Sequence, residues 1–335
     1  VNHLMGRYGF EVNGVFLSQT DYSDETTRQA ILDDLRDTVE SYKDTRGVLM
    51  YLLGNENNYG LSWTSFEIED LPEEAKDPRA EYLYSLMGEA ATLVSGMDER
   101  HPVAMVNGDI NYLDVIARTC GDLDIMGANV YRGGSSGDLF QRVADEMGVP
   151  FVYTEFGADA YDARRGREDD VSQAGYLLRQ WQEIYEQSHG KGGAGTAIGG
   201  FIFQWSDGWW KFRQEENLDV HDTNASWATD AYVHDHVEGK NNMNEEWWGI
   251  AAKNATDSDG FFSVTPRTSY YVLQQAFRLD PYGPATTPEV IRARFGEIRL
   301  SEYTHRYATG RAIADVADLK TVRLGNVRMN YESSI

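Results

Sequence analysis

Five short apolar runs with the composition of β-strands recur through the first two thirds of the chain. They occupy residues 48–53, 102–106, 123–128, 150–154 and 198–204. Between and around them lie stretches with helical spacing of apolar residues, at 24–44, 79–98, 138–147 and 171–189. Strands that alternate with helices over short connections predict a parallel α/β architecture.

Every predicted strand ends in a polar or chemically useful side chain. These side chains are Asn55 and Glu56, Asn107 and Asp109, Asn129 and Tyr131, Glu155, and Trp205 and Asp207. In an open sheet such groups would be spread along an edge. In a barrel of alternating strands and helices, the carboxyl ends of all strands meet on one face, where function is located. The pattern favours a (β/α)8 barrel.

The charge of the chain argues against two classes of partner. The sequence has 335 residues, with 54 acidic and 30 basic side chains and a formal net charge of −24. Nucleic acids and anionic membrane surfaces would repel such a chain. No stretch approaches the roughly 18–20 apolar residues of a membrane span. Cys120 is the only cysteine, so no disulfide forms within the chain.

The sequence contains no motif for a cofactor or a metal. The run "GGAG" at 192–195 precedes a strand rather than opening a helix, so it is not a phosphate or dinucleotide loop. The "HDH" run at 234–236 has no third ligand at a useful spacing. We therefore expect neither a cofactor nor a metal.

The amino-acid composition of the chain changes near residue 284. The run "PYGPATTPE" at 281–289 has the Pro and Gly content of a linker. The tail beyond it contains short alternating runs such as "KTVRLGNVRMNY". We expect one domain over residues 1–283, and over 284–335 a linker followed by the start of a β-rich segment.

Two glutamates at the ends of different strands on one barrel face indicate glycoside hydrolysis. Glu56 ends the run "YLLGNE", and Glu155 ends "VPFVYTE". In that reaction one carboxyl group protonates the leaving oxygen, and the other attacks the sugar or activates water. The surroundings must push the two pKa values apart.

Four motifs in order resemble the catalytic barrel of glycoside hydrolase family 2, the β-galactosidase and β-glucuronidase family. They are "LLGNE", "NVY", "TEFGAD" and "GGFIFQWSDGWW". The resemblance places this family's retaining acid/base on Glu56 and its nucleophile on Glu155. It also implies that Tyr131 is the tyrosine of the sixth strand and Trp205 the aromatic residue of the eighth. The lysine-bearing signature of the glucuronidases is not evident.

The resemblance makes residues 48–53 the fourth barrel strand, with residues 1–3 ending the third. It implies that the first two strands, and the β-sandwich domains that precede the barrel in this family, lie outside this chain. We therefore expect an N-terminally incomplete barrel over residues 1–283. A periplasmic or secreted location is favoured over a cytoplasmic one, and the oligomeric state stays open.

Further residues are candidates for contact with a carbohydrate. Asn55 is expected to bind a sugar 2-hydroxyl, and Tyr131 to bond the Glu155 carboxylate and lower its pKa. Sugars also stack on aromatic rings and bond to polar side chains. The remaining candidates, each with packing or a loop position as the alternative, are Asn129, Trp205, Asp207, His3, Tyr59 and Trp63.

The sequence therefore predicts a retaining β-glycosidase that hydrolyses O-glycosidic bonds of oligo- or polysaccharides by double displacement. The family resemblance implies β-galactosidase-, β-glucosidase- or β-glucuronidase-like activity. Two alternatives remain open. One is a transglycosylase, of the glucanosyltransferase kind, with the same pair of glutamates. The other is a non-catalytic carbohydrate-binding protein on a glycosidase scaffold.

Overall fold

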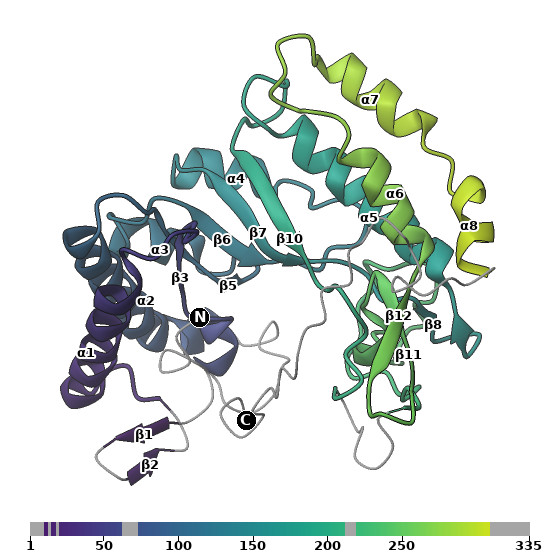
Figure 1. The fold of residues 1–335 in the computed structure, drawn as a ribbon. Coiled ribbons are helices and arrows are strands. Elements are labelled where there is room, and N and C mark those ends of the chain that lie inside the picture. Colours follow the sequence, from purple (N-terminus) through teal and green to yellow (C-terminus); the bar gives the residue numbers. More distant parts are fainter. Residues whose placement is uncertain (1–9, 13–14, 18–19, 62–72, 212–218, 309–335) are drawn as a thin grey trace.

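The computed structural model describes residues 10–12, 15–17, 20–61, 73–211 and 219–308. Within these ranges the chain has a mixed α/β fold in which parallel strands alternate with helices (Figure 1). A hairpin of β1 (Phe10–Val12) and β2 (Val15–Leu17) precedes α1 (Glu25–Tyr42). The helix begins where Asp24 accepts a hydrogen bond from the Thr27 backbone at 2.7 Å, as an N-cap aspartate does.

The parallel strands are neighbours in space in the order in which they occur in the chain. β3 (Tyr51–Leu53) pairs with β4 (Val103–Met105), and a bridge between Ala104 and Ile125 links β4 to the segment before β6. A four-stranded parallel sheet follows, with the order β5 (Asn107–Gly108), β6 (Met126–Asn129), β7 (Phe151–Phe156) and β10 (Ala197–Ile202). All five strands predicted from the sequence are therefore present.

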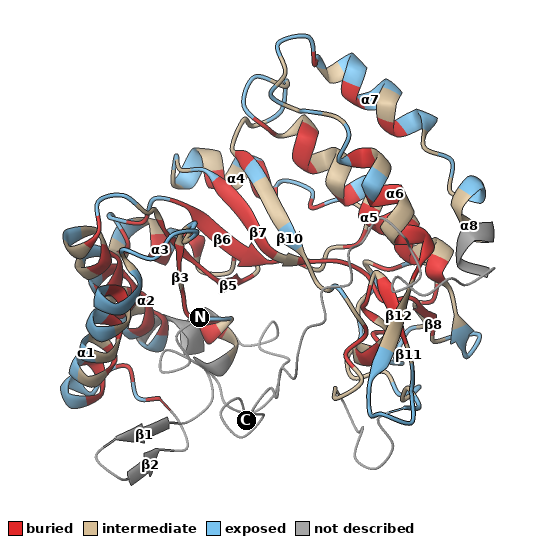
Figure 2. Ribbon diagram, in the orientation of Figure 1, coloured by how far each residue is buried: buried red, intermediate tan, exposed pale blue. Residues whose placement is uncertain are grey.

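Helices connect these strands and cover the sheet. They are α2 (Glu73–Met97), α3 (Leu113–Thr119), α4 (Leu139–Glu146) and α5 (Asp170–Glu186). Their inward faces and the strands form one core, which includes Ile31, Leu35 and Val39 of α1 (Figure 2). Tyr42, which the spacing places on that face, is instead 56% exposed at the end of α1. The four predicted helices are confirmed; α3 was not predicted.

The described strands form an open parallel sheet, so a (β/α)8 barrel without its first two strands, as the sequence predicts, is neither closed nor established within this part of the chain. β10 pairs with β7 on one side, and on its other side no described strand pairs with it. Ile198 and Phe201 of β10 are 42% and 47% exposed. A strand in a closed barrel has a neighbouring strand on both sides. The unpaired side of β10 is therefore an open edge of the described sheet. The strand expected at residues 1–3 lies outside the described residues.

A smaller group of elements follows β7 and β10 and packs beside the sheet (Figure 1). Two antiparallel hairpins, β8–β9 and β11–β12, belong to it, together with the single turn η4. The bounds are β8 (Tyr161–Asp162), β9 (Arg167–Glu168), η4 (Glu245–Trp247), β11 (Ala251–Thr256), β12 (Phe262–Pro266) and α6 (Thr268–Ala276).

Helices continue past residue 284, where the sequence predicted a linker and a β-rich segment. α7 (Pro288–Glu297) and α8 (Ser301–Ala308) occupy the described part of this region. Ile291 and Phe295 of α7 belong to the main core, and the Phe295 ring lies 5.5 Å from that of Tyr185 on α5. The alternating runs beyond residue 308 lie outside the described residues, so a β-rich tail stays a prediction.

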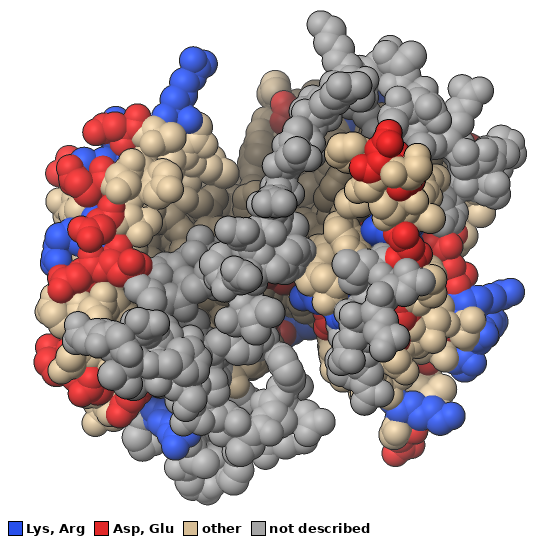
Figure 3. All heavy atoms as spheres, turned by 60° about the horizontal axis from the view of Figure 1, so that its bottom comes forward, with Lys and Arg blue, Asp and Glu red and all other residues tan. Residues whose placement is uncertain are grey.

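The surface carries the negative charge that the composition requires. Figure 3 shows acidic side chains gathered on the side of the molecule that holds α1 and α2, with basic ones among them. Asp33, Asp37 and Glu40 of α1 are among the acidic residues of that side. None of the described helices combines the length and the apolar character of a membrane span.

Candidate active site

Backbone hydrogen bonds hold the residues that follow the parallel strands in register beyond the strand ends. The Glu56 N–H donates to the Val106 carbonyl at 2.8 Å, and the Val130 N–H donates to the Glu155 carbonyl at 2.9 Å. The Phe203 N–H donates to the carbonyl of Phe156 at 2.8 Å. The Asp109 N–H donates to the Asn129 carbonyl at 2.9 Å and completes the series. The carboxyl ends of β3, β5, β6, β7 and β10 are thereby fixed to one another, and the side chains that follow them share one edge of the sheet.

A tight turn after β3 presents Glu56. Gly54 has φ +70°, and a Cβ there would lie 2.2 Å from Asn57 Oδ1 and 2.8 Å from Met87 Cε, so only glycine fits. The Asn57 side chain accepts a hydrogen bond from the Asn55 N–H at 2.9 Å. Glu56 itself has φ +52°, a left-handed conformation that is uncommon outside glycine. This strained backbone directs the carboxylate toward the ends of the neighbouring strands.

Asn129 connects Glu56 to the strand that carries Glu155. Its amide nitrogen donates to Glu56 Oε1 at 3.2 Å and to Asn55 Oδ1 at 3.1 Å. Thr154 Oγ1 donates to Asn129 Oδ1 at 2.7 Å and fixes the amide plane. Because Thr154 is the residue before Glu155 on β7, this amide links the two predicted catalytic glutamates, although 99 residues separate them in the sequence.

Tyr131 donates a hydrogen bond of 2.8 Å to Glu155 Oε2, as the sequence analysis predicted. The pKa of Glu155 is nevertheless raised to about 7. Burial is the largest cause, and the charge of Glu56 adds to it, while Tyr131, Lys211 and Asn129 act in the opposite direction. The expected lowering by Tyr131 is therefore present but outweighed. The repulsion between the two carboxylates therefore adds to burial in raising the pKa of Glu155 above the usual value of a glutamate.

Tyr131→Phe is expected to raise the pKa of Glu155 further, because the ionised carboxylate loses a hydrogen-bond donor. A bond to a charged group contributes about 1.5 kcal/mol or more, so we expect a shift of about one pH unit. A 13C NMR titration of the Glu155 carboxyl group measures it. An unchanged or lower midpoint in the folded variant would contradict the assigned bond.

A second group of side chains near Tyr131 comes from the loops after β10, and the sequence motifs did not identify most of these residues. The Trp248 ring is buried 4.9 Å from the ring of Tyr131, and the Trp227 ring lies 6.0 Å from it. Trp227 Nε1 donates to Glu245 Oε1 at 2.8 Å, and Lys211 Nζ lies 3.7 Å from Glu245 Oε2. The sequence signal for these loops was the aromatic pairs in "DGWWK" and "EEWWG", but no spacing rule relates such pairs to the ends of the strands.

The structure places Phe203, rather than Trp205, beside these groups. The Phe203 ring lies 6.0 Å from that of Trp248, and Lys211 Nζ lies 5.3 Å from the centre of the Phe203 ring. Trp205 is 52% exposed, with its ring 6.0 Å from Tyr270 on α6. Trp205 as a sugar contact therefore stays a prediction.

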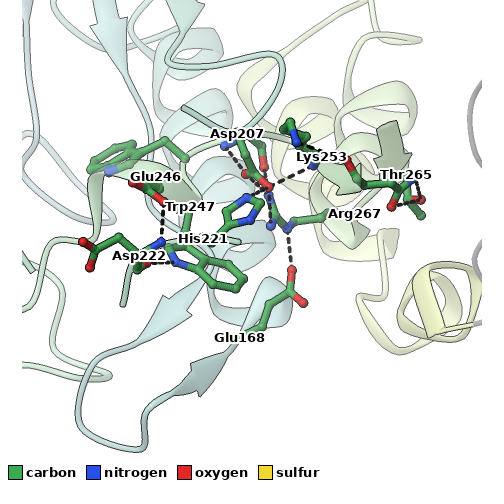
Figure 4. Close-up of polar contacts among 12 residues, drawn as sticks. Glu168, Asp207, His221, Asp222, Glu246, Trp247, Lys253, Thr265 and Arg267 are labelled. Atoms are coloured by element: carbon green, nitrogen blue, oxygen red, sulfur yellow. Dashed lines mark hydrogen bonds and ion pairs between the residues drawn. The ribbon is translucent and has the colours of Figure 1, made fainter. Parts of the chain in front are cut away.

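Asp207 is a structural residue, and its prediction as a sugar contact is wrong. The carboxylate is fully buried and accepts bonds from Arg267, His221 and the backbone N–H groups of Gly249 and Lys253 (Figure 4). Burial would raise its pKa, but the charges and hydrogen bonds of Arg267 and His221 outweigh burial and hold that pKa below its usual value. No acceptor position of this carboxylate faces solvent.

The remaining predicted contacts have mixed outcomes. Tyr59 is partly exposed and lies over the end of β5, where a Cβ on Gly108 would be 2.5 Å from its ring. The exposed Asn55 adjoins Glu56 and is held by Asn129. His3 and Trp63 lie outside the described residues. Within those residues, no group of three or more His, Cys, Asp or Glu side chains is arranged to hold a metal ion.

Comparison with known proteins gives similarity of structure only. No protein-family model matches the sequence, and no curated protein matches it. A β-glucuronidase from Bacteroides uniformis is 16% identical with a TM-score of 0.48, over 77% of this chain and 27% of that one. A GH2 β-galacturonidase from Eisenbergiella tayi bound to galacturonate is 17% identical with a TM-score of 0.43, over 76% and 37%. A β-glucuronidase from Ruminococcus gnavus is 14% identical with a TM-score of 0.47, over 77% and 37%.

This chain thus spans between about a quarter and two fifths of the length of these three structures.

Proposed function

We propose that this chain carries the catalytic site of a retaining β-glycosidase that hydrolyses O-glycosidic bonds of oligo- or polysaccharides. The observation that carries the proposal is the placement of Glu56 and Glu155 at neighbouring strand ends: the Asn129 amide that binds Glu56 is held by Thr154, the residue before Glu155, and Tyr131 donates to Glu155. Two carboxyl groups close together suit double displacement, because inversion needs a wider gap to admit water between acid and base.

In the first step Glu155 attacks the anomeric carbon and Glu56 protonates the leaving oxygen. In the second step Glu56 removes a proton from water, and that water releases the sugar from Glu155 with net retention. The pair must enter the reaction with one proton, held by Glu56. Burial and the charge of Glu56 raise the pKa of Glu155 to about 7 and so oppose its ionised form. Tyr131 and Asn129 then favour the ionised form of Glu155.

Five segments are proposed to be the fourth to eighth strands of a (β/α)8 barrel: β3, β4 with its continuation β5, β6, β7 and β10. Their sequential order supports this, as does the exposed edge of β10 with Ile198 and Phe201. Asn55, exposed beside Glu56, is proposed to bind the sugar 2-hydroxyl. Such bonds strengthen as the transition state forms.

A panel of nitrophenyl glycosides tests the function. We expect the chain to release nitrophenol from at least one β-glycoside, and NMR of the first product to show the β-anomer. Release of the α-anomer would indicate inversion and overturn the double-displacement mechanism. Absence of turnover with every glycoside, in a folded protein that still binds sugar, would favour a carbohydrate-binding role. Products longer than the substrate would indicate transglycosylation.

A further inference from the structure

Lys211 lies on the β10 side of the carboxylate pair and has no part in the chemistry proposed above. Its ammonium group is 5.3 Å from the centre of the Phe203 ring and 3.7 Å from Glu245 Oε2. The side chain is 35% exposed. Phe203 donates its N–H to the carbonyl of Phe156, the residue after Glu155. The ring beneath the ammonium group is therefore fixed to the strand that carries Glu155.

Glu245 is anchored independently of Lys211. Its Oε1 accepts a bond of 2.8 Å from Trp227 Nε1 and one of 3.4 Å from Ser226 Oγ. The Trp227 ring in turn packs against the ring of Tyr131. The Lys211–Glu245 separation of 3.7 Å exceeds hydrogen-bond length, so charge attraction alone holds the ammonium group there. The ring and the carboxylate together keep one positive charge beside the site.

We infer that Lys211 is a positioning residue of the proposed glycosidase: Glu245 and Phe203 hold its ammonium group where it counters the repulsion between Glu56 and Glu155. The catalytic importance of Lys211 rests on the proposed function. The ionisable groups whose charges or hydrogen bonds act on Glu155 are Glu56 after β3, Tyr131 after β6 and Lys211 after β10, while the charge of Glu245 of η4 acts on Tyr131.

The signs of these effects are consistent with that role. The charge of Lys211 lowers the pKa of Glu155, against the effects of burial and of Glu56. A lower pKa favours the ionised carboxylate, which is the form that attacks the sugar. Lys211 lowers the pKa of Glu155 as Tyr131 and Asn129 do, but it comes from the loops after β10. It contributes charge rather than a hydrogen bond.

Lys211→Met tests the inference, because methionine keeps the apolar stem and removes the charge. We expect the midpoint of the Glu155 carboxyl titration, followed by 13C NMR, to rise by about half a pH unit or more. Lys211→Arg should restore the wild-type midpoint. The acidic limb of the kcat/KM profile should move in the same direction. The spectrum of Glu155→Gln identifies the signal.

Lys240→Met is the matched control, since it removes the same charge from an exposed lysine of the following loop. It should leave both the titration and the activity unchanged. A folded Lys211→Met protein with an unchanged midpoint overturns the inference, and so does a Lys211→Arg protein that behaves like Lys211→Met. If circular dichroism shows that Lys211→Met is unfolded, Lys211→Gln takes its place. The titration needs no turnover, so a wild type without glycosidase activity would overturn the proposed function separately.

Discussion

Glu155→Ala is expected to abolish hydrolysis of every glycoside, because no covalent glycosyl-enzyme can form without the nucleophile. Glu56→Ala removes the proton donor and should slow turnover of substrates with poor leaving groups by roughly 10²–10⁴-fold. An activated aryl glycoside needs little protonation, so its first step should survive in Glu56→Ala. The second step then lacks a base, and the covalent intermediate should accumulate.

Azide separates the two roles. As an anionic nucleophile it needs no base, so it should restore turnover in Glu56→Ala and yield the β-glycosyl azide. In Glu155→Ala it can attack only the free substrate and should yield the α-product. NMR of the products distinguishes the anomers. Glu238→Ala, which changes an exposed glutamate, should behave as wild type. The same anomer from both variants, or rescue of neither, would show that the roles are assigned wrongly.

Arg267→Met is expected to lower the free energy of unfolding by about 3–5 kcal/mol, the largest stability effect that we anticipate from a single substitution. Arg267 is 1% exposed and donates to Asp207, to Glu168 at 2.7 Å and to the Gly249 carbonyl at 2.6 Å. Its removal leaves the carboxylate of Asp207 fully buried without its main counter-charge. Urea unfolding followed by circular dichroism measures the loss.

Two further variants make this measurement specific. Arg292→Met breaks an exposed ion pair with Glu289 on α7 and should cost less than about 1 kcal/mol. Asp207→Asn combined with Arg267→Met removes both charges, so the double variant should lose less than the sum of the single losses. If Arg267→Met cost no more than Arg292→Met, the network would not stabilise the fold as we describe.

Much of the framework was predictable because it depends on local patterns. Apolar runs of strand length and helical spacing between them identified four helices and every described parallel strand except the two-residue β5. Their order then placed Glu56, Asn129, Tyr131 and Glu155 on one edge, since parallel strands share a direction. The hydrogen bond from Tyr131 to Glu155 follows from that placement.

The side chains from the loops after β10 could not be predicted in the same way. Lys211, Trp227 and Glu245 come from irregular segments, where side-chain position depends on tertiary contacts rather than on periodicity. Asp207 was wrongly predicted to be a sugar contact. It follows a strand, as the proposed site residues do, but it is buried against Arg267, which lies 60 residues later in the sequence. The net direction of the Glu155 pKa also depends on burial, which no local motif specifies.

The left-handed backbone of Glu56 has an evolutionary consequence. A non-glycine residue at φ +52° costs of order 1 kcal/mol of folding free energy, so glycine at this position would make the fold more stable. Substitutions that increase stability would therefore tend to remove the proposed proton donor. A chain that keeps glutamate at this position gives up folding free energy to do so, and directed evolution for thermostability alone should favour inactive variants here.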